Sequence, residues 1–127
     1  MRRQEWYDSA ETLDSNDYRI DNIHFTQGGI RRSEDVGDPD QLQEFAENTH
    51  WATFGADQAA WTHMEADLPT LRGVYESYRR GGYTGPMSFY VATEPNGNVQ
   101  VLLRVGGAGD RRRSHDDAPP SVLWKWT

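Results

Sequence analysis

Side chains that could carry out acid–base or metal chemistry are few in this chain and widely spaced. Histidine titrates nearest neutrality and is a common general base, and the chain has four, at positions 24, 50, 63 and 115. His63 and Glu65 are two residues apart on a predicted helix, so they point to different sides and make a poor metal pair. Cysteine is absent, as are the patterns of zinc proteases, EF-hands and phosphate-binding loops. We therefore predict no catalytic residue, no metal site and no cofactor, and we favour a protein that is not an enzyme.

Two stretches late in the sequence could instead bind an anion. Residues 106–110, GGAGD, would let a phosphate approach the backbone, but they lack the glycine spacing of nucleotide-binding loops and no helix start follows them. Residues 111–117, RRRSHDD, combine three arginines with a histidine and two aspartates, and in a solvated loop these opposite charges can simply neutralise each other. The weak candidates for an anion site are Arg104, Arg111, Arg112 and Arg113.

Charge is distributed unevenly along the chain. The net charge is −7 over 127 residues. Residues 1–70 hold five arginines against fifteen acids, a net −10, whereas residues 71–127 hold seven arginines and one lysine against five acids, a net +3. An acidic surface disfavours nonspecific binding to nucleic acid and suits a basic protein surface.

The elements that must position these residues are organised around residues 87–105, which have the pattern of a β-hairpin. Two runs rich in β-branched and aromatic residues flank residues 95–97, Pro-Asn-Gly. A three-residue loop would pair Phe89 with Leu103, and one face would then carry Met87, Phe89, Val91, Val99, Val101, Leu103 and Val105. A two-residue loop would divide them between the two faces, so we predict the three-residue loop.

Helix start signals occur in the middle of the chain, at Asp38-Pro39, at Asp57 and at Asp67 with Pro69. Apolar side chains recur at helical spacing behind each signal, and Gly81-Gly82 ends the last helix. Further strands are expected at 18–26 and 121–127. Trp124 and Trp126 on the latter either complete the core or form an exposed apolar patch.

The remaining segments are expected to be irregular: an acidic, solvated segment at 1–17, a charged loop at 30–38 and a turn-rich loop at 106–120. Helices segregated from an antiparallel sheet predict the α+β class. We expect a single domain over residues 1–127, with about four mainly antiparallel strands and two to three helices packed on one face of the sheet. That face is the one that carries Met87, Phe89 and Val91.

Binding is a better prediction for this chain than chemistry. An acidic protein can cover a basic site on a partner protein, such as a toxin or an enzyme that acts on nucleic acid, because complementary charge speeds association. Small acidic bacterial immunity proteins and inhibitors work this way, and the likeness is one of size and charge only. The residues expected to contact the partner are Asp35, Asp38, Asp40, Glu44 and Glu47, with Trp51 as an aromatic anchor.

Three alternatives remain open. A small enzyme or ligand-binding domain would need a pocket between sheet and helices, for which the polar candidates are His24, Tyr75, Tyr78, Tyr90 and Arg104. A nucleic-acid binder would combine Tyr83 with the arginines at 79, 80, 104 and 111–113. A homodimer could form through an exposed edge of the hairpin or of the last strand. No apolar run has the length of a membrane helix and the first residues lack the apolar centre of a signal peptide, so a cytoplasmic location is expected.

Overall fold

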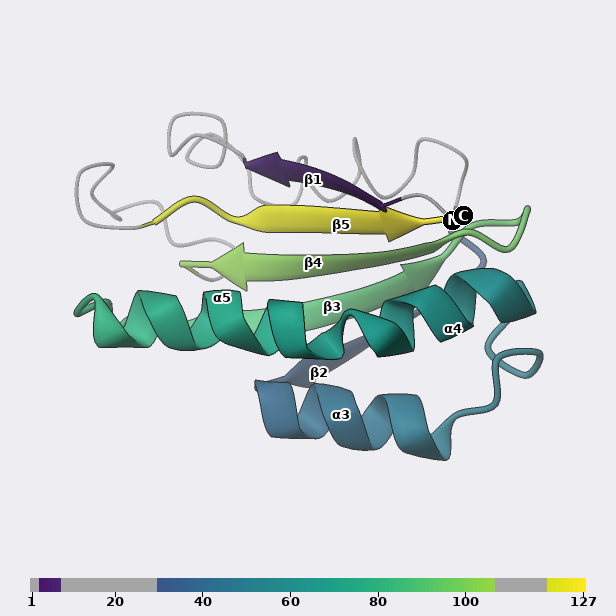
Figure 1. Ribbon diagram of the computed structural model, residues 1–127, viewed down its shortest axis with the longest axis horizontal. Coiled ribbons are helices and arrows are strands. Elements are labelled where there is room, and N and C mark those ends of the chain that lie inside the picture. Colours follow the sequence, from purple (N-terminus) through teal and green to yellow (C-terminus); the bar gives the residue numbers. More distant parts are fainter. Residues whose placement is uncertain (1–2, 8–29, 107–118) are drawn as a thin grey trace.

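The computed structural model describes residues 3–7, 30–106 and 119–127, which form one antiparallel sheet with helices on one of its faces. In chain order the strands are β1 (Arg3–Tyr7), β2 (Arg32–Gly37), β3 (Met87–Thr93), β4 (Val99–Val105) and β5 (Val122–Trp126). Their order across the sheet is β1-β5-β4-β3-β2 (Figure 1). The strand predicted at 18–26 and most of the loop predicted at 106–120 lie outside the described residues.

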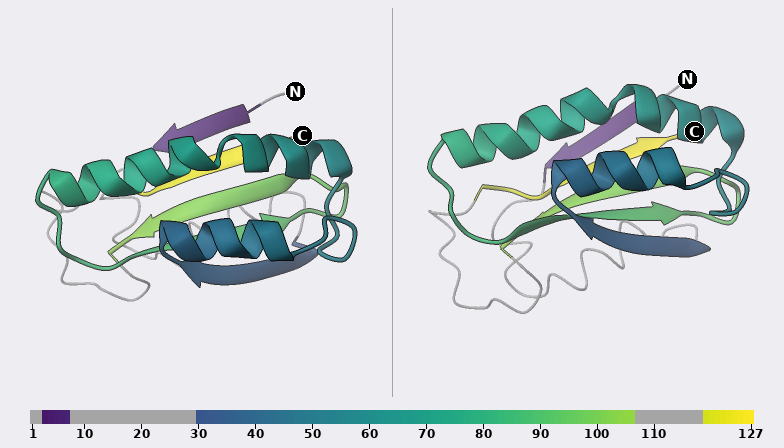
Figure 2. Two further views of the ribbon diagram at one scale, coloured as in Figure 1. Left: turned by 60° about the horizontal axis from the view of Figure 1, so that its bottom comes forward. Right: turned by 90° about the horizontal axis from the view of Figure 1, so that it is seen from below.

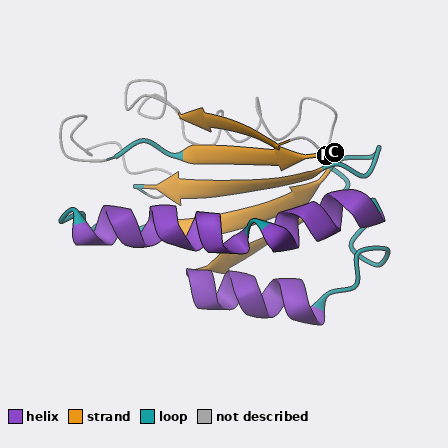
Figure 3. Ribbon diagram, viewed as in Figure 1, coloured by secondary structure: helices purple, strands orange, loops and turns teal. Residues whose placement is uncertain are grey.

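Three helices separate β2 from β3 in the chain, and they are α3 (Pro39–Asn48), α4 (Gln58–Ala66) and α5 (Leu68–Arg80). All three lie on the same side of the sheet (Figures 2 and 3). Strands β2 to β5 make a four-stranded antiparallel sheet, and β1 adds to it beside β5. The predicted α+β class and the three predicted helices are therefore confirmed.

The hairpin formed by β3 and β4 has the register that the apolar pattern predicts. Phe89 pairs with Leu103. At the turn, the Glu94 N–H donates to the Asn98 carbonyl at 3.0 Å, and the Gly97 N–H donates to the Glu94 carbonyl at 2.8 Å. Gly97 has a φ of 95°, a conformation that side-chain-bearing residues rarely adopt. These bonds close the predicted three-residue loop.

The helix-covered face of the sheet carries the main hydrophobic core, as predicted. Burying a side chain of the size of Val, Leu or Phe stabilises the fold by about 1.5–3 kcal/mol. Both tryptophans of β5 are fully buried on this face, so the alternative of an exposed apolar patch does not hold for them. The buried sheet residues of this core are Val36, Phe89, Val91, Val99, Val101, Leu103, Val105, Val122, Trp124 and Trp126, and the helices contribute Leu42, Ala46, Ala60, Trp61, Met64, Leu68 and Leu71.

Two segments expected to be irregular contain strands. Residues 32–37 form β2 rather than a charged loop, because an outer strand can keep its side chains in water; only Val36 of this strand is buried. Residues 3–7 form β1, whose backbone pairs with β5. Both expectations were based on charge density, which does not distinguish a loop from a solvated edge strand.

The free edges of the sheet also differ from expectation. The hairpin strands and β5 each pair with a neighbour on both sides, so they offer no edge for a second chain. Among the described residues, the outer strands are β1 and β2.

The junction of α4 and α5 is joined to β5 by a partly buried hydrogen bond. Asp67 ends α4 and precedes α5, and its Oδ2 accepts the indole N–H of Trp126 at 2.7 Å. Trp126 is fully buried, and a buried indole N–H without an acceptor is costly.

The hairpin turn is joined to the start of α4 in a similar way. The Asp57 N–H donates to the Gly97 carbonyl at 2.9 Å. The Asp57 carboxylate meanwhile caps α4 by accepting the N–H groups of Ala59 at 3.0 Å and Ala60 at 3.3 Å. One residue thus fixes both the helix start and the position of the turn.

Replacing Asp67 by Ala should lower the free energy of unfolding by about 1.5–3 kcal/mol, because the bond that is lost involves a charged acceptor and leaves the indole N–H buried without a partner. Asp67→Asn keeps an acceptor oxygen and should lose clearly less. Urea denaturation followed by circular dichroism measures both. Equal losses in the two variants would show that the indole bond is not the source of the effect.

Gly97→Ala should destabilise the protein more than Gly82→Ala. The two glycines have φ values of 95° and 104°, so both alanines carry backbone strain of roughly 1–3 kcal/mol. At Gly97 the new Cβ would also lie 2.9 Å from the backbone nitrogen of Asp57, whereas at Gly82 it would meet nothing within 4 Å. Thermal unfolding of the two variants isolates the steric contribution, and equal midpoints would contradict it.

Candidate functional site

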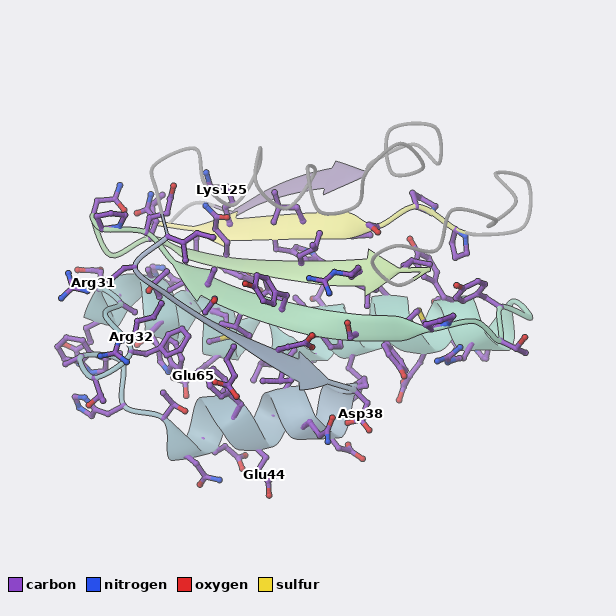
Figure 4. The ribbon with its side chains drawn as sticks, turned by 180° about the vertical axis from the view of Figure 1, so that it is seen from behind. Arg31, Arg32, Asp38, Glu44, Glu65 and Lys125 are labelled. Carbon is purple, nitrogen blue, oxygen red and sulfur yellow. The ribbon has the colours of Figure 1, made fainter. Side chains whose placement is uncertain are left out.

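Strand β2 and helix α3 bring the acids predicted to contact a partner to one edge of the molecule. In Figure 4, Arg31 and Arg32 lie at the start of β2, Asp38 lies at its end and Glu44 points outward from α3. All five predicted acids are exposed, and they are Asp35, Asp38, Asp40, Glu44 and Glu47. Their chemical surroundings differ, and these differences decide which of them are available to a partner.

Asp38 is the N-cap of α3. Its carboxylate accepts the Gln41 N–H at 2.9 Å, and the Gln41 side-chain oxygen accepts the Asp38 N–H at 3.1 Å. This reciprocal pair is a capping box, with Pro39 in the first turn as the sequence indicates. The charge of Asp38 therefore already serves the helix start.

Asp40 forms an ion pair with an arginine of α5. Nothing in the sequence indicates that this helix lies beside α3. Oδ1 of Asp40 lies 2.7 Å from Nη2 of Arg72 on α5, and Arg72 also lies 3.5 Å from Glu76. The hydrogen bond to Asp40 raises the pKa of Arg72 above its ordinary value. The Asp40 side chain is 85% exposed, so the pair contributes little stability but offsets part of the acidic charge.

Asp35 lies on the face of β2 that points away from the helices. It pairs across the sheet with Tyr90, and its carboxylate lies 3.9 Å from Nη1 of Arg104 on β4. The Arg104 guanidinium also lies 5.2 Å from the centre of the Tyr90 ring. A residue predicted to contact a partner and a residue predicted to bind an anion are thus neighbours. Residues 111–113, the other anion candidates, lie outside the described residues.

Glu44 and Glu47 are the acids of α3 that have no basic neighbour among the described residues. Glu47 accepts a hydrogen bond from the side-chain amide of Gln43 at 2.8 Å, one helical turn away. Glu44 forms no ion pair or side-chain hydrogen bond with any residue in the described part of the chain. These two carboxylates are the acids most available for an intermolecular contact.

A groove runs between β2 and α3, and Glu44 stands on its rim. It consists of two adjoining open hollows, of about 560 Å³ and about 590 Å³, which share Glu34, Phe45 and Thr49. We call it the β2–α3 groove. The first hollow is lined by Glu34, Asp35, Val36, Gly37, Gln41, Glu44, Phe45, Asn48 and Thr49. The second is lined by Arg31, Arg32, Ser33, Glu34, Phe45, Thr49 and Phe54.

An aromatic cluster forms the apolar wall of the groove. Phe45 is half-buried, and its ring lies edge-on to Phe54 at 5.2 Å and 6.0 Å from Trp61. Phe54 and Trp61 are buried in the main core. The groove therefore joins an apolar wall to a charged rim, as protein–protein interfaces join an apolar centre to a polar rim.

Trp51, predicted as an aromatic anchor, lies in the connection that follows α3. Its side chain is half-buried and packs against the main core, and its ring stacks on that of the exposed His50 at a centroid distance of 5.0 Å. It lines neither hollow of the groove. Its partly exposed ring remains open to a contact beside the groove.

The residues predicted to line an internal ligand pocket are on opposite faces of the sheet. Tyr75 stacks on Phe89 at 5.8 Å on the helix-covered face. Tyr90 donates to the Ser33 hydroxyl at 3.0 Å on the other face, where Arg104 also lies. The sheet separates the two groups, and His24 lies outside the described residues.

Neither a metal centre nor a membrane span occurs in the described part of the chain. No set of three or more His, Asp or Glu side chains there is arranged to hold a metal ion. None of its helices combines the length and the apolar character that crossing a bilayer requires.

Comparison with protein-family models, with curated proteins and with solved structures finds no match to this chain.

Glu34, Phe45 and the basic pair Arg31-Arg32 were not among the predicted site residues. A signal for them was present: in residues 32–35, Arg-Ser-Glu-Asp, the long charged side chains at 32 and 34 alternate as they would on one face of a strand. Phe45 is one of the apolar residues that recur at helical spacing behind Asp38-Pro39, which predicts a place on the core face of the helix. The structure shows that it also reaches the groove.

Replacing Asp38 separates its capping role from its charge. Asp38→Ala should lower the free energy of unfolding by about 0.5–2 kcal/mol, whereas Asp38→Asn should be nearly neutral because Asn is an equally good N-cap. Thermal unfolding of both variants measures this. A loss in Asp38→Asn as large as that in Asp38→Ala would show that the charge, rather than the cap, stabilises α3.

Proposed function

We propose that this chain is a non-catalytic protein-binding module whose acidic β2–α3 edge covers a basic site on a partner protein, in the manner of a small inhibitor or immunity protein. The single observation that carries the proposal is the position of Glu44 and Glu47. Both carboxylates are exposed on α3 without a basic neighbour among the described residues, and Glu44 stands beside the half-buried Phe45 of the groove.

The electrostatic argument follows from which charges are already paired. Asp35 and Asp40 have arginine neighbours within the fold, and Asp38 caps a helix. Glu34 and Glu44 remain as a negative rim around an apolar wall, and Glu47 adds an exposed negative charge on the same helix as Glu44. Such a rim attracts a basic surface over a Debye length, about 8 Å at physiological salt, and raises the association rate more than the final affinity.

A protein that inhibits by covering a site needs a rigid contact surface rather than a reactive group. The wall of the groove is anchored in the core through Phe54 and Trp61, and α3 is fixed by its capping box. A partner would therefore meet a surface that loses little conformational entropy on binding. This favours a binding function for the edge.

The proposal predicts that this protein retains a basic partner protein and that reversing the charge of Glu44 weakens the retention. Glu44→Lys should slow association by about tenfold, with a weaker effect at high salt, because it reverses a charge on the contact rim. The experiment couples purified protein to a matrix, captures its partner from the native host and measures binding kinetics with the isolated partner over a salt series.

The matched control is Glu65→Lys. Glu65 is also an exposed glutamate on a helix, α4, and the change in net charge is the same, but Glu65 lines neither hollow of the groove. Figure 4 shows the two glutamates on different helices. If Glu65→Lys slows association as much as Glu44→Lys, net charge rather than the β2–α3 edge governs binding. If no basic protein is retained in stoichiometric amount, the proposal fails.

A further inference from the structure

The outer edge of β2 carries backbone hydrogen-bonding groups that none of the described strands uses. In an antiparallel pair, residues alternate between those whose N–H and C=O point toward the neighbouring strand and those whose groups point away. At the β3–β4 turn the bonding pair is Glu94 with Asn98, so the groups of the preceding residue, Thr93, point toward β2. Consistently, the Thr93 carbonyl accepts the Arg31 N–H at 2.7 Å.

The register then identifies which groups of β2 face outward. Arg32 pairs with Thr93 and Glu34 with Val91, so these two residues of β2 direct their backbone groups inward. Ser33 lies between these two residues and Asp35 follows them. The N–H and C=O groups of Ser33 and Asp35 therefore point away from the sheet. No strand in the described part of the chain lies on that side of β2.

The side chains beside this edge form an ordered charge pattern. Arg32 and Glu34 lie on the helix-covered face, since their partners on β3, Thr93 and Val91, lie there. Val36, the extra residue of the bulge between Asp35 and Gly37, is buried on the same face. From the bulge to the start of the strand, the groove therefore presents an apolar, an acidic and a basic position in turn.

We infer that the β2–α3 groove binds an extended segment of a partner protein as an added antiparallel strand, with an apolar, a basic and an acidic side chain at alternate positions. The inference rests on the proposed function for the existence of a partner and adds the mode of contact. In this mode backbone hydrogen bonds supply affinity, and pockets for alternate side chains supply specificity.

The chemistry of the segment follows from the register. Its apolar side chain lies opposite Val36 and against Phe45, its basic side chain opposite Glu34 and within reach of Glu44, and its acidic side chain opposite Arg32. Pairs of opposite charge directly across a ladder are stabilising, and like pairs are destabilising. From its amino end, the segment therefore carries an apolar, a basic and an acidic residue at its first, third and fifth positions, with any residue at the two positions between them.

The position of α3 favours a single strand over a second sheet as the occupant. Figure 2 shows α3 alongside β2, above the same edge. The hollows of the groove are lined by residues of both elements, so an added strand would lie between them. The bulge at Val36 twists the strand and ends the ladder after a short stretch, which limits unspecific pairing of the edge.

The test uses a capped heptapeptide, Thr-Val-Ser-Lys-Ser-Asp-Thr, and the full chain labelled with ¹⁵N. We expect saturable binding, with the amide signals of Ser33 and Asp35 shifted downfield and their hydrogen exchange slowed by about tenfold or more, because both N–H groups become bonded. A second peptide carries N-methyl groups on its two serines, which face Ser33 and Asp35. It keeps every charge and should bind at least about tenfold more weakly.

Two variants of the chain locate the contact. Ser33→Pro removes an outward N–H without removing a bond to β3. An edge strand tolerates proline at such a position. The variant should therefore fold but no longer bind the heptapeptide. Ser33→Ala keeps the N–H and should bind normally. The Glu34→Lys variant should not bind the heptapeptide but should bind a peptide in which aspartate replaces the lysine. A variant that has merely lost its fold would bind neither peptide.

The outcomes separate this inference from the proposed function. If both peptides bind equally and the Glu44→Lys variant weakens both, the edge binds by charge alone, so strand addition is overturned and the proposed function stands. If no signal of β2 moves at millimolar peptide, strand addition is also overturned. If the chain alone sediments as a dimer with slow exchange at Ser33, a second copy occupies the edge and the inference of a foreign segment is wrong.

Discussion

The antiparallel register of β3 against β4 is the constraint on which the rest of the structure depends. With Phe89 opposite Leu103, most of the large aliphatic and aromatic side chains of the hairpin fall on the helix-covered face, while Tyr90 and Leu102 lie on the other. A shift of one residue would move that set to the other side of the sheet. The three helices, the tryptophans of β5 and Val36 of β2 pack on the face that this register selects, so the position of the groove also follows from it.

The sequence was sufficient to predict the elements that carry their own local signals. The capping residues Asp38 and Asp57 mark the starts of α3 and α4 where the structure has them, and the Pro-Asn-Gly turn predicts both the hairpin and its register. These signals depend only on residues close together in the chain, so they are visible in the sequence itself. The α+β class follows from them because the order of the elements restricts the layers that can bury their apolar faces.

What could not be predicted depends on partners that are distant in the chain. Strand β2 has four exposed polar residues in a row, and only its pairing with β3 makes it a strand. The ion pair of Asp40 with Arg72 and the contact of Asp35 with Arg104 join residues of different elements. A list of acids therefore gives their positions in the chain, but it cannot show which of them already have a basic neighbour in the fold.

One consequence concerns the order in which the sheet can be completed. Strand β5 lies between β1 and β4, so the amino-terminal strand β1 pairs with residues 122–126. A nascent chain leaving the ribosome must hold residues 3–7 unpaired until those late residues emerge, whereas the hairpin can close locally much sooner. Pairing between such distant segments is slow, and chaperones that shield exposed strands would find their substrate in this interval.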